Sequence, residues 1–180
     1  IGVTQDLNSL GVPGTLGIGL AGLSGGGAEY RGQAPLVNSP VNDVSGEYLV
    51  LGVNLGAGVE VTEELSAGAT MTLGTGFSQL GLVQSSAMVH DYALRGTVGV
   101  AYDLNPCNTL GAYYQSKLGF GFPNAFRLPD ETYRDINIDQ PQTIGFGIAN
   151  RRFLDGDLLL AADVYYKLWE NADLWQDVME

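Results

Sequence analysis

The residues from Glu47 to Val61, which read EYLVLGVNLGAGVEV, decide the fold of this 180-residue chain. The odd positions are apolar throughout: Leu49, Leu51, Val53, Leu55, Ala57, Val59 and Val61. The even positions are mostly small or polar: Tyr48, Val50, Gly52, Asn54, Gly56, Gly58 and Glu60. Strict alternation is typical of a β-strand, whose side chains point to opposite faces in turn. The stretch is more than twice the usual strand length of about 5 or 6 residues, so it predicts an unusually long strand.

The same alternation recurs along the rest of the chain. It runs through Leu65–Phe77, Tyr92–Leu104, Thr109–Phe122, Gln142–Arg152 and Asp157–Trp169. A weaker run covers Thr15 to Leu23, and Ile1 to Thr4 are compatible with the end of another strand. We therefore expect about seven or eight strands in an all-β chain.

The connections between these strands alternate in length. Short turns are expected at Thr62–Glu64, at Asn105–Asn108 and at Leu154–Gly156, where Asp-Gly is a hairpin signal. Long polar connections with glycine and proline are expected at Ser24–Gly46, Gln79–Asp91 and Pro123–Pro141. Short turns at one rim and long loops at the other predict an antiparallel up-and-down meander. We find no linker, so residues 1–180 are expected to form one β-barrel segment without a second domain.

The composition narrows the class of protein. The net charge of −12 excludes a nucleic-acid partner, which needs a basic surface. Cys107 is the single cysteine, so the chain has neither an internal disulfide nor a Cys/His metal site. No apolar run approaches the roughly 20 residues of a membrane-spanning helix. We expect no cofactor and no bound metal.

A barrel in lipid and a soluble barrel both alternate, and three features favour the membrane. The strands are long enough for the roughly 9 to 11 residues of a tilted span. The central parts of the apolar faces have no charge, whereas the opposite faces mix charges with glycine, as a watery lumen permits. Aromatic residues near the strand ends fit an interfacial girdle. These are Phe77, Tyr92, Tyr102, Phe120, Phe122 and Tyr166. We therefore expect a transmembrane β-barrel.

Three segments carry a resemblance to a known family. The run Thr109–Leu118, TLGAYYQSKL, resembles the Gly-x-x-Tyr-x-Ser strand of the FadL-type outer-membrane transporters of hydrophobic compounds, the long-chain fatty acid and toluene channels. The run Gln140–Ala149, QPQTIGFGIA, is similar to the Pro-containing strand start of that family. The run Leu158–Trp169, LLLAADVYYKLW, resembles the strand that follows it. The order and spacing match, and the similarity spans roughly residues 47 to 175.

The resemblance implies a function and a location. Members of the family are barrels of about 14 strands with an N-terminal hatch, and they take up hydrophobic molecules such as long-chain fatty acids or aromatic hydrocarbons passively. It implies the outer membrane of a Gram-negative-type bacterium, with the long loops outside and with lipid and lipopolysaccharide as neighbours. No catalysis is implied. We expect the hatch and the closing strands to be absent here, and missing sequence or another chain to supply further strands.

Two groups of residues are candidates for ligand binding. Arg95, Lys117, Arg151 and Lys167 share the parity of the lumen face and are compatible with a cationic strip that attracts a carboxylate. The alternative is that these cations pair with Asp103 and Asp163 and hold the wall. Phe120, Phe122, Phe126 and Leu128 are compatible with an apolar entry groove. The alternative for these is an interface girdle and loop packing.

Other motifs have plainer explanations. Gly17–Gly22 matches G-x-G-x-x-G, but glycine-rich loop is expected to follow instead of the helix of a nucleotide site. His90 with Ser85, Ser86 and Asp91 suggests a hydrolase, yet we expect these residues in a solvated loop. Acidic groups lack the ligand spacing of a calcium loop; they are Asp130, Glu131 and Asp135, and Asp155 with Asp157. The alternatives to transport are a structural or adhesive barrel and, less favoured, a barrel enzyme.

Overall fold

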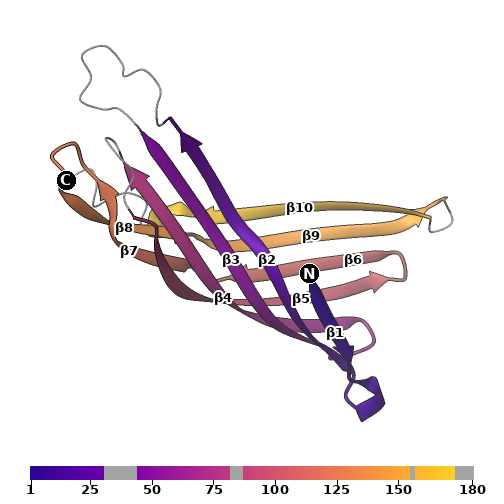
Figure 1. The fold of residues 1–180 in the computed structure, drawn as a ribbon. Coiled ribbons are helices and arrows are strands. Elements are labelled where there is room, and N and C mark those ends of the chain that lie inside the picture. Colours follow the sequence, from indigo (N-terminus) through magenta and orange to yellow (C-terminus); the bar gives the residue numbers. More distant parts are fainter. Residues whose placement is uncertain (31–43, 82–86, 155–156, 173–180) are drawn as a thin grey trace.

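The computed structural model describes residues 1–30, 44–81, 87–154 and 157–172, and it contains a ten-stranded sheet (Figure 1). The strands are β1 (Gly2–Asp6), β2 (Gly14–Glu29), β3 (Ser45–Glu60), β4 (Leu65–Gly81), β5 (Val89–Asn105), β6 (Asn108–Gln115), β7 (Leu118–Arg127), β8 (Tyr133–Gln140), β9 (Gln142–Phe153) and β10 (Leu158–Leu168). Two single-turn 3₁₀ helices, Asn8–Leu10 and Trp169–Asn171, complete the described elements. None of the described helices is long and apolar enough to span a membrane.

Eight strands form a continuous antiparallel wall in the order β1-β2-β3-β4-β5-β6-β9-β10. The turns after β1, β3 and β5 lie at one end of this wall, and the C-terminal ends of β2 and β4 lie at the other end (Figure 1). The up-and-down meander with short turns at one rim is therefore confirmed. β1 and β10 are the two edges of the described sheet, which is a partial barrel.

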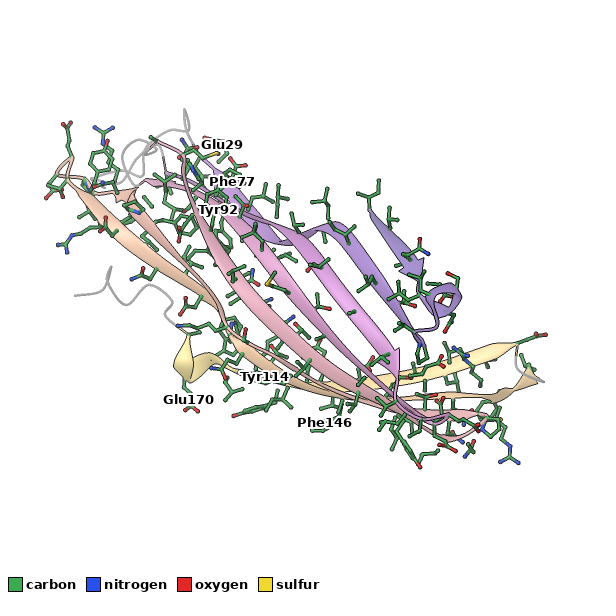
Figure 2. The ribbon with its side chains drawn as sticks, turned by 90° about the horizontal axis from the view of Figure 1, so that it is seen from below. Glu29, Phe77, Tyr92, Tyr114, Phe146 and Glu170 are labelled. Carbon is green, nitrogen blue, oxygen red and sulfur yellow. The ribbon has the colours of Figure 1, made fainter. Side chains whose placement is uncertain are left out.

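The alternation of β3 and β4 separates the two faces of the wall. Leu49 lies opposite Phe77 and Val53 lies opposite Leu73, so the apolar positions of both strands share one face. Large apolar side chains on this face are exposed over β3, β4, β5, β6 and β9. Figure 2 shows two pairs of its aromatic residues: Phe77 with Tyr92 near the long-connection end, and Tyr114 with Phe146 further along. We call this the outer face.

The expected strand Thr109–Phe122 is wrong, because the chain breaks at Ser116 and Lys117 into β6 and β7. The backbone N–H of Ser116 still donates to the Gly96 carbonyl at 2.9 Å, but the N–H of Gly96 donates to the Ser116 hydroxyl at 3.0 Å, and the regular pairing ends at Thr97–Gln115. Apart from Ser116 itself, the even positions are apolar on both sides of the break, so the period of the sequence does not reveal it. The expected loop Pro123–Pro141 contains β8, and the described residues form ten strands instead of about seven or eight.

β7 and β8 form a hairpin that lies against the wall on the side opposite the outer face. Its apolar side chains make up most of the buried core, which consists of Val50, Ala93, Leu118, Phe120, Phe122, Ala125, Phe126, Ile136 and Ile138. The floor under the rings is glycine, because a Cβ on Gly76 would lie 2.8 Å from Cζ of Phe122 and 3.0 Å from Cδ1 of Phe120. We call the face that the hairpin covers the inner face.

The second strand is longer than the sequence indicates. Ser24 to Gly27, expected in a loop, pair with β3 as part of β2, so the connection to β3 is shorter than the expected Ser24–Gly46. The register shifts between Gly22 and Ser24, and the extra residue Leu23 packs against the hairpin core. A β-bulge re-aims side chains in this way.

Candidate ligand passage along the inner face

The register of the wall arranges the inner face in rows that cross the strands. Val50, Gly76 and Asp91 form one row beneath the hairpin, and Gly52, Gly74 and Ala93 form the next. Beyond them, toward the short turns, the rows become polar and then rich in glycine. A molecule moving along the lumen would meet these rows in order.

The hairpin covers the row that contains Val50, Gly76 and Asp91 with apolar side chains. Phe120 and Phe122 are buried and stack with ring centroids 5.9 Å apart, and Tyr48 meets Phe122 edge-on at 6.2 Å. Phe126 is buried in the same core. The expectation of Phe120 and Phe122 in an outer girdle is therefore wrong, because the break at Ser116 turns β7 inward. The entry-groove role stays a prediction.

The first polar row toward the short turns contains Arg95, which is only 7% exposed. Nη2 of Arg95 donates to Oε1 of Gln140 at 2.9 Å, and Nε2 of Gln140 donates to the Ser24 hydroxyl at 2.7 Å. Nε of Arg95 has no hydrogen-bond partner among the described residues, and the hydroxyl of Tyr48 lies near Ser24 and Gln140. A buried polar group without a partner is rare in proteins, so this level is suited to receive a polar group from a ligand or water.

The four candidate cations do not form one strip. Lys117 lies beside the hairpin base, where Nζ contacts Oδ2 of Asp139 at 2.8 Å, so Lys117 and Arg95 are held by neighbouring residues of β8. Lys167 lies on β10, one row further toward the short turns, with Nζ 5.7 Å from the centroid of the Tyr165 ring. Arg151 is exposed near the short-turn end of β9.

The expected acidic partners have other contacts. Oδ1 of Asp103 accepts a 2.5 Å hydrogen bond from the Thr109 hydroxyl, and the Asp163 carboxylate lies over the backbone of Gly147. The acidic partner that the structure gives Lys117 is Asp139 instead. Sequence reasoning missed Asp139 and Gln140, because it placed both in a loop; recognising β8 would have put them beside the wall.

The glycine-rich motif and His90 both lie in β-strands. Gly17–Gly22 lies within β2, and no described helix starts there. His90 and Asp91 are in β5 instead of a loop, and alternation points them to opposite faces, which separates the proposed hydrolase partners. His90 lies between Phe77 and Tyr92, with ring centroids at 6.3 and 5.7 Å. Ser85 and Ser86 lie outside the described residues.

Asp130 and Asp135 accept hydrogen bonds within the β7–β8 hairpin. Oδ1 of Asp130 accepts bonds from the amide and the hydroxyl of Thr132 at 3.0 and 2.6 Å, and these bonds lower the pKa of the Asp130 carboxyl. Oδ1 of Asp135 accepts from the amide of Asn124 at 2.8 Å. No cluster among the described residues has the ligands for a metal ion, and Asp155 lies outside them.

Comparisons with solved structures give the same fold. The TodX deltaS2S3 mutant monoaromatic hydrocarbon channel matches with a TM-score of 0.66 and 18% identity, over 88% of this chain and 51% of the channel. The Pseudomonas putida toluene transporter TodX matches with a TM-score of 0.64 and 19% identity, over 88% of this chain and 52% of the transporter. No family model and no curated protein matches the sequence.

The chain therefore spans about half the length of the solved structures that it matches. It has the fold of a partial barrel of the TodX kind. The resemblance drawn from the three strand motifs is confirmed at the level of the fold.

Proposed function

We propose that this chain forms part of an outer-membrane channel through which hydrophobic small molecules enter passively. The proposal rests on how side chains are distributed between the two faces of the wall. The outer face exposes large apolar side chains along its strands, and the inner face has polar rows and glycine. Such a wall is stable where lipid covers the outer face and water reaches the lumen. Further strands close the barrel, because lipid does not tolerate an unpaired strand edge.

The class of cargo is supported by the two similar structures, which are described as a monoaromatic hydrocarbon channel and a toluene transporter. Long-chain fatty acids and aromatic hydrocarbons are the candidates. An apolar molecule that leaves water gains about 25 cal/mol per Å² of surface that it buries, which is enough to draw it from the aqueous exterior into an apolar passage. The long connections face the cell exterior in this proposal, and no covalent chemistry takes place.

The ligand-binding residues of this proposal lie at the hairpin. Phe120, Phe122 and Phe126 supply apolar surface that the cargo reaches when the hairpin shifts from the wall, because all three side chains are buried while it is docked. Arg95 and Lys117 supply positive charge at the hairpin base, where the low local dielectric strengthens the attraction between a cation and a carboxylate. Arg151 and Lys167, which lie elsewhere on the inner face, are assigned to later positions on the path.

Uptake by cells that carry the complete barrel tests this proposal. We expect Arg95→Gln and Lys117→Gln to weaken uptake of a fatty acid more than uptake of an uncharged hydrocarbon of equal chain length, because only the acid uses the cation. Phe120→Ala and Phe122→Ala should weaken both. Phe146→Ala, on the outer face, is the control and should change neither.

The outcomes separate the parts of the proposal. Equal loss of both cargoes in Arg95→Gln and Lys117→Gln would remove the cations from the passage. Unchanged uptake in all four of these variants, or equal uptake by cells that lack the protein, would contradict the channel itself.

A further inference from the structure

One row of the inner face consists of glycine and tyrosine alone across β3, β4, β5, β6, β9 and β10. The register places its members directly opposite one another: Gly58, Gly68, Gly99, Tyr113, Gly145 and Tyr165. The row belongs to the inner face, because Gly58 and Gly68 share the parity of Val50 and Gly76 beneath the hairpin. Across these six strands, this row is bare backbone except for two aromatic rings.

The ring of Tyr113 rests on the backbone of β9. A Cβ on Gly145 would lie 2.6 Å from Cζ and 2.8 Å from Cδ1 of Tyr113, so only glycine allows the ring this position. Gly99, the neighbour of Tyr113 on β5, leaves the other side of the ring without a side chain. Tyr113 is 39% exposed. The ring therefore has one side supported by the wall, and part of its surface is open to the lumen.

Tyr165 lies on the far side of the same glycine. It pairs with Gly145 from β10 and is 60% exposed. Neighbouring strands are about 4.8 Å apart, so the two tyrosines leave the wall about 10 Å from each other. The ring of Tyr113 itself covers the backbone of Gly145 between them, so one more planar ring would lie against the lumen-facing side of Tyr113.

The neighbouring rows limit the length of an apolar ligand at this level. The row toward the hairpin contains hydroxyl and amide groups: Thr70, Thr97, Gln115 and Thr143. Nε2 of Gln115 donates to the Thr97 hydroxyl at 3.3 Å, which ties two of them together. The row toward the short turns includes the Asp163 carboxylate over Gly147. A single ring fits between these polar rows better than a long alkyl chain, which would cross them.

We propose that Tyr113 is a specificity-determining residue that favours planar aromatic hydrocarbons by stacking. The proposal rests on the proposed channel function and names the ligand class for this level of it. Offset-stacked or edge-to-face contact adds to the burial that any hydrocarbon of equal size would gain. From the usual strength of aromatic pairs, we expect a preference of about 2- to 10-fold for an aromatic ring over its saturated counterpart.

Competing uptake of toluene and methylcyclohexane, which have equal numbers of carbon atoms, tests the inference in the complete barrel. We expect Tyr113→Leu to lower the toluene preference about 2- to 10-fold and Tyr113→Phe to keep it. Tyr114→Leu is the matched control, because Tyr114 is the next residue, is similarly exposed and points to the outer face. If leucine prevents folding, Tyr113→Met makes the same comparison with an unbranched side chain.

An unchanged preference in folded Tyr113→Leu or Tyr113→Met would overturn the role of Tyr113, while leaving the channel intact. An equal loss of preference in Tyr114→Leu would also overturn it. Wild-type cells that take up neither hydrocarbon faster than cells without the protein would contradict the proposed function, and the role of Tyr113 with it.

Discussion

At the residue scale, a single side chain on the outer face determines whether the wall can remain in lipid. Val53 and Val100 are exposed on this face, and each faces other apolar residues across its strand pairs. A cation there would have to leave water, whereas on the inner face it would remain hydrated. The two faces of one strand therefore tolerate charge very differently.

This difference gives a direct prediction. Val53→Arg or Val100→Arg should destabilise the folded barrel by about 2 to 4 kcal/mol if the position lies near the bilayer midplane. Thr70→Arg, on the inner face, should cost much less. Reversible unfolding by urea in lipid vesicles measures all three. Equal tolerance of the three arginines would refute the assignment of the outer face to lipid.

At the element scale, the β7–β8 hairpin closes part of the inner face and is attached mainly by side-chain packing. Its ladder to the wall is a short parallel one, in which Leu80 and Gly81 pair with Phe126 and Arg127. The amide of Gly121 also donates to Oδ2 of Asp91 at 2.8 Å. Because apolar packing provides most of this attachment, the fit between the rings and the glycine floor decides whether the hairpin stays docked.

We therefore predict that Gly76→Val undocks the hairpin. The added side chain would overlap the rings of Phe120 and Phe122, and overpacking of this kind costs about 1 to 3 kcal/mol. Gly26→Val is the control, because a Cβ on Gly26 meets nothing within 4 Å. Amide hydrogen exchange should accelerate in β7 and β8 for Gly76→Val alone. Equal protection of the hairpin amides from exchange in both variants would show that the space under the rings accommodates a valine side chain.

At the scale of the whole molecule, the two ends of the wall differ. Short turns such as Val61–Glu64 lie at one end, and the hairpin turn at Asp130 lies at the other (Figure 1). Barrels of the outer membrane have long loops outside and short turns in the periplasm. The shape of the sheet thus predicts its orientation.

Cysteine labelling of intact cells measures this orientation. In a Cys107→Ser background, Met88→Cys and Asp130→Cys at the long-connection end should react with an impermeant maleimide. Glu63→Cys in the short turn should react only after the outer membrane is opened. The reverse pattern would invert the topology and would place the hairpin in the periplasm.

The sequence alone was sufficient to predict the antiparallel wall. Alternation in Glu47–Val61 and its repeats reports directly which side chains share a face, because a strand has a side-chain period of two. The fold class, the meander and the outer-face residues follow from that period. The partial-barrel resemblance also came from ordered strand motifs, and the comparison of folds agrees with it.

Only the tertiary structure decided what occupies the inner face. Leu118, Phe120 and Phe122 keep the alternation of an outer-face strand, so their period is the same whether they meet lipid or the wall. Their burial depends on the Ser116 contact with Gly96 and on glycine at Gly74 and Gly76, and these partners are distant in sequence. The same holds for Tyr113 above Gly145, a contact set by the register between strands. The side-chain period of a strand determines on which face a residue lies. Pairing between distant segments determines which groups that face contacts.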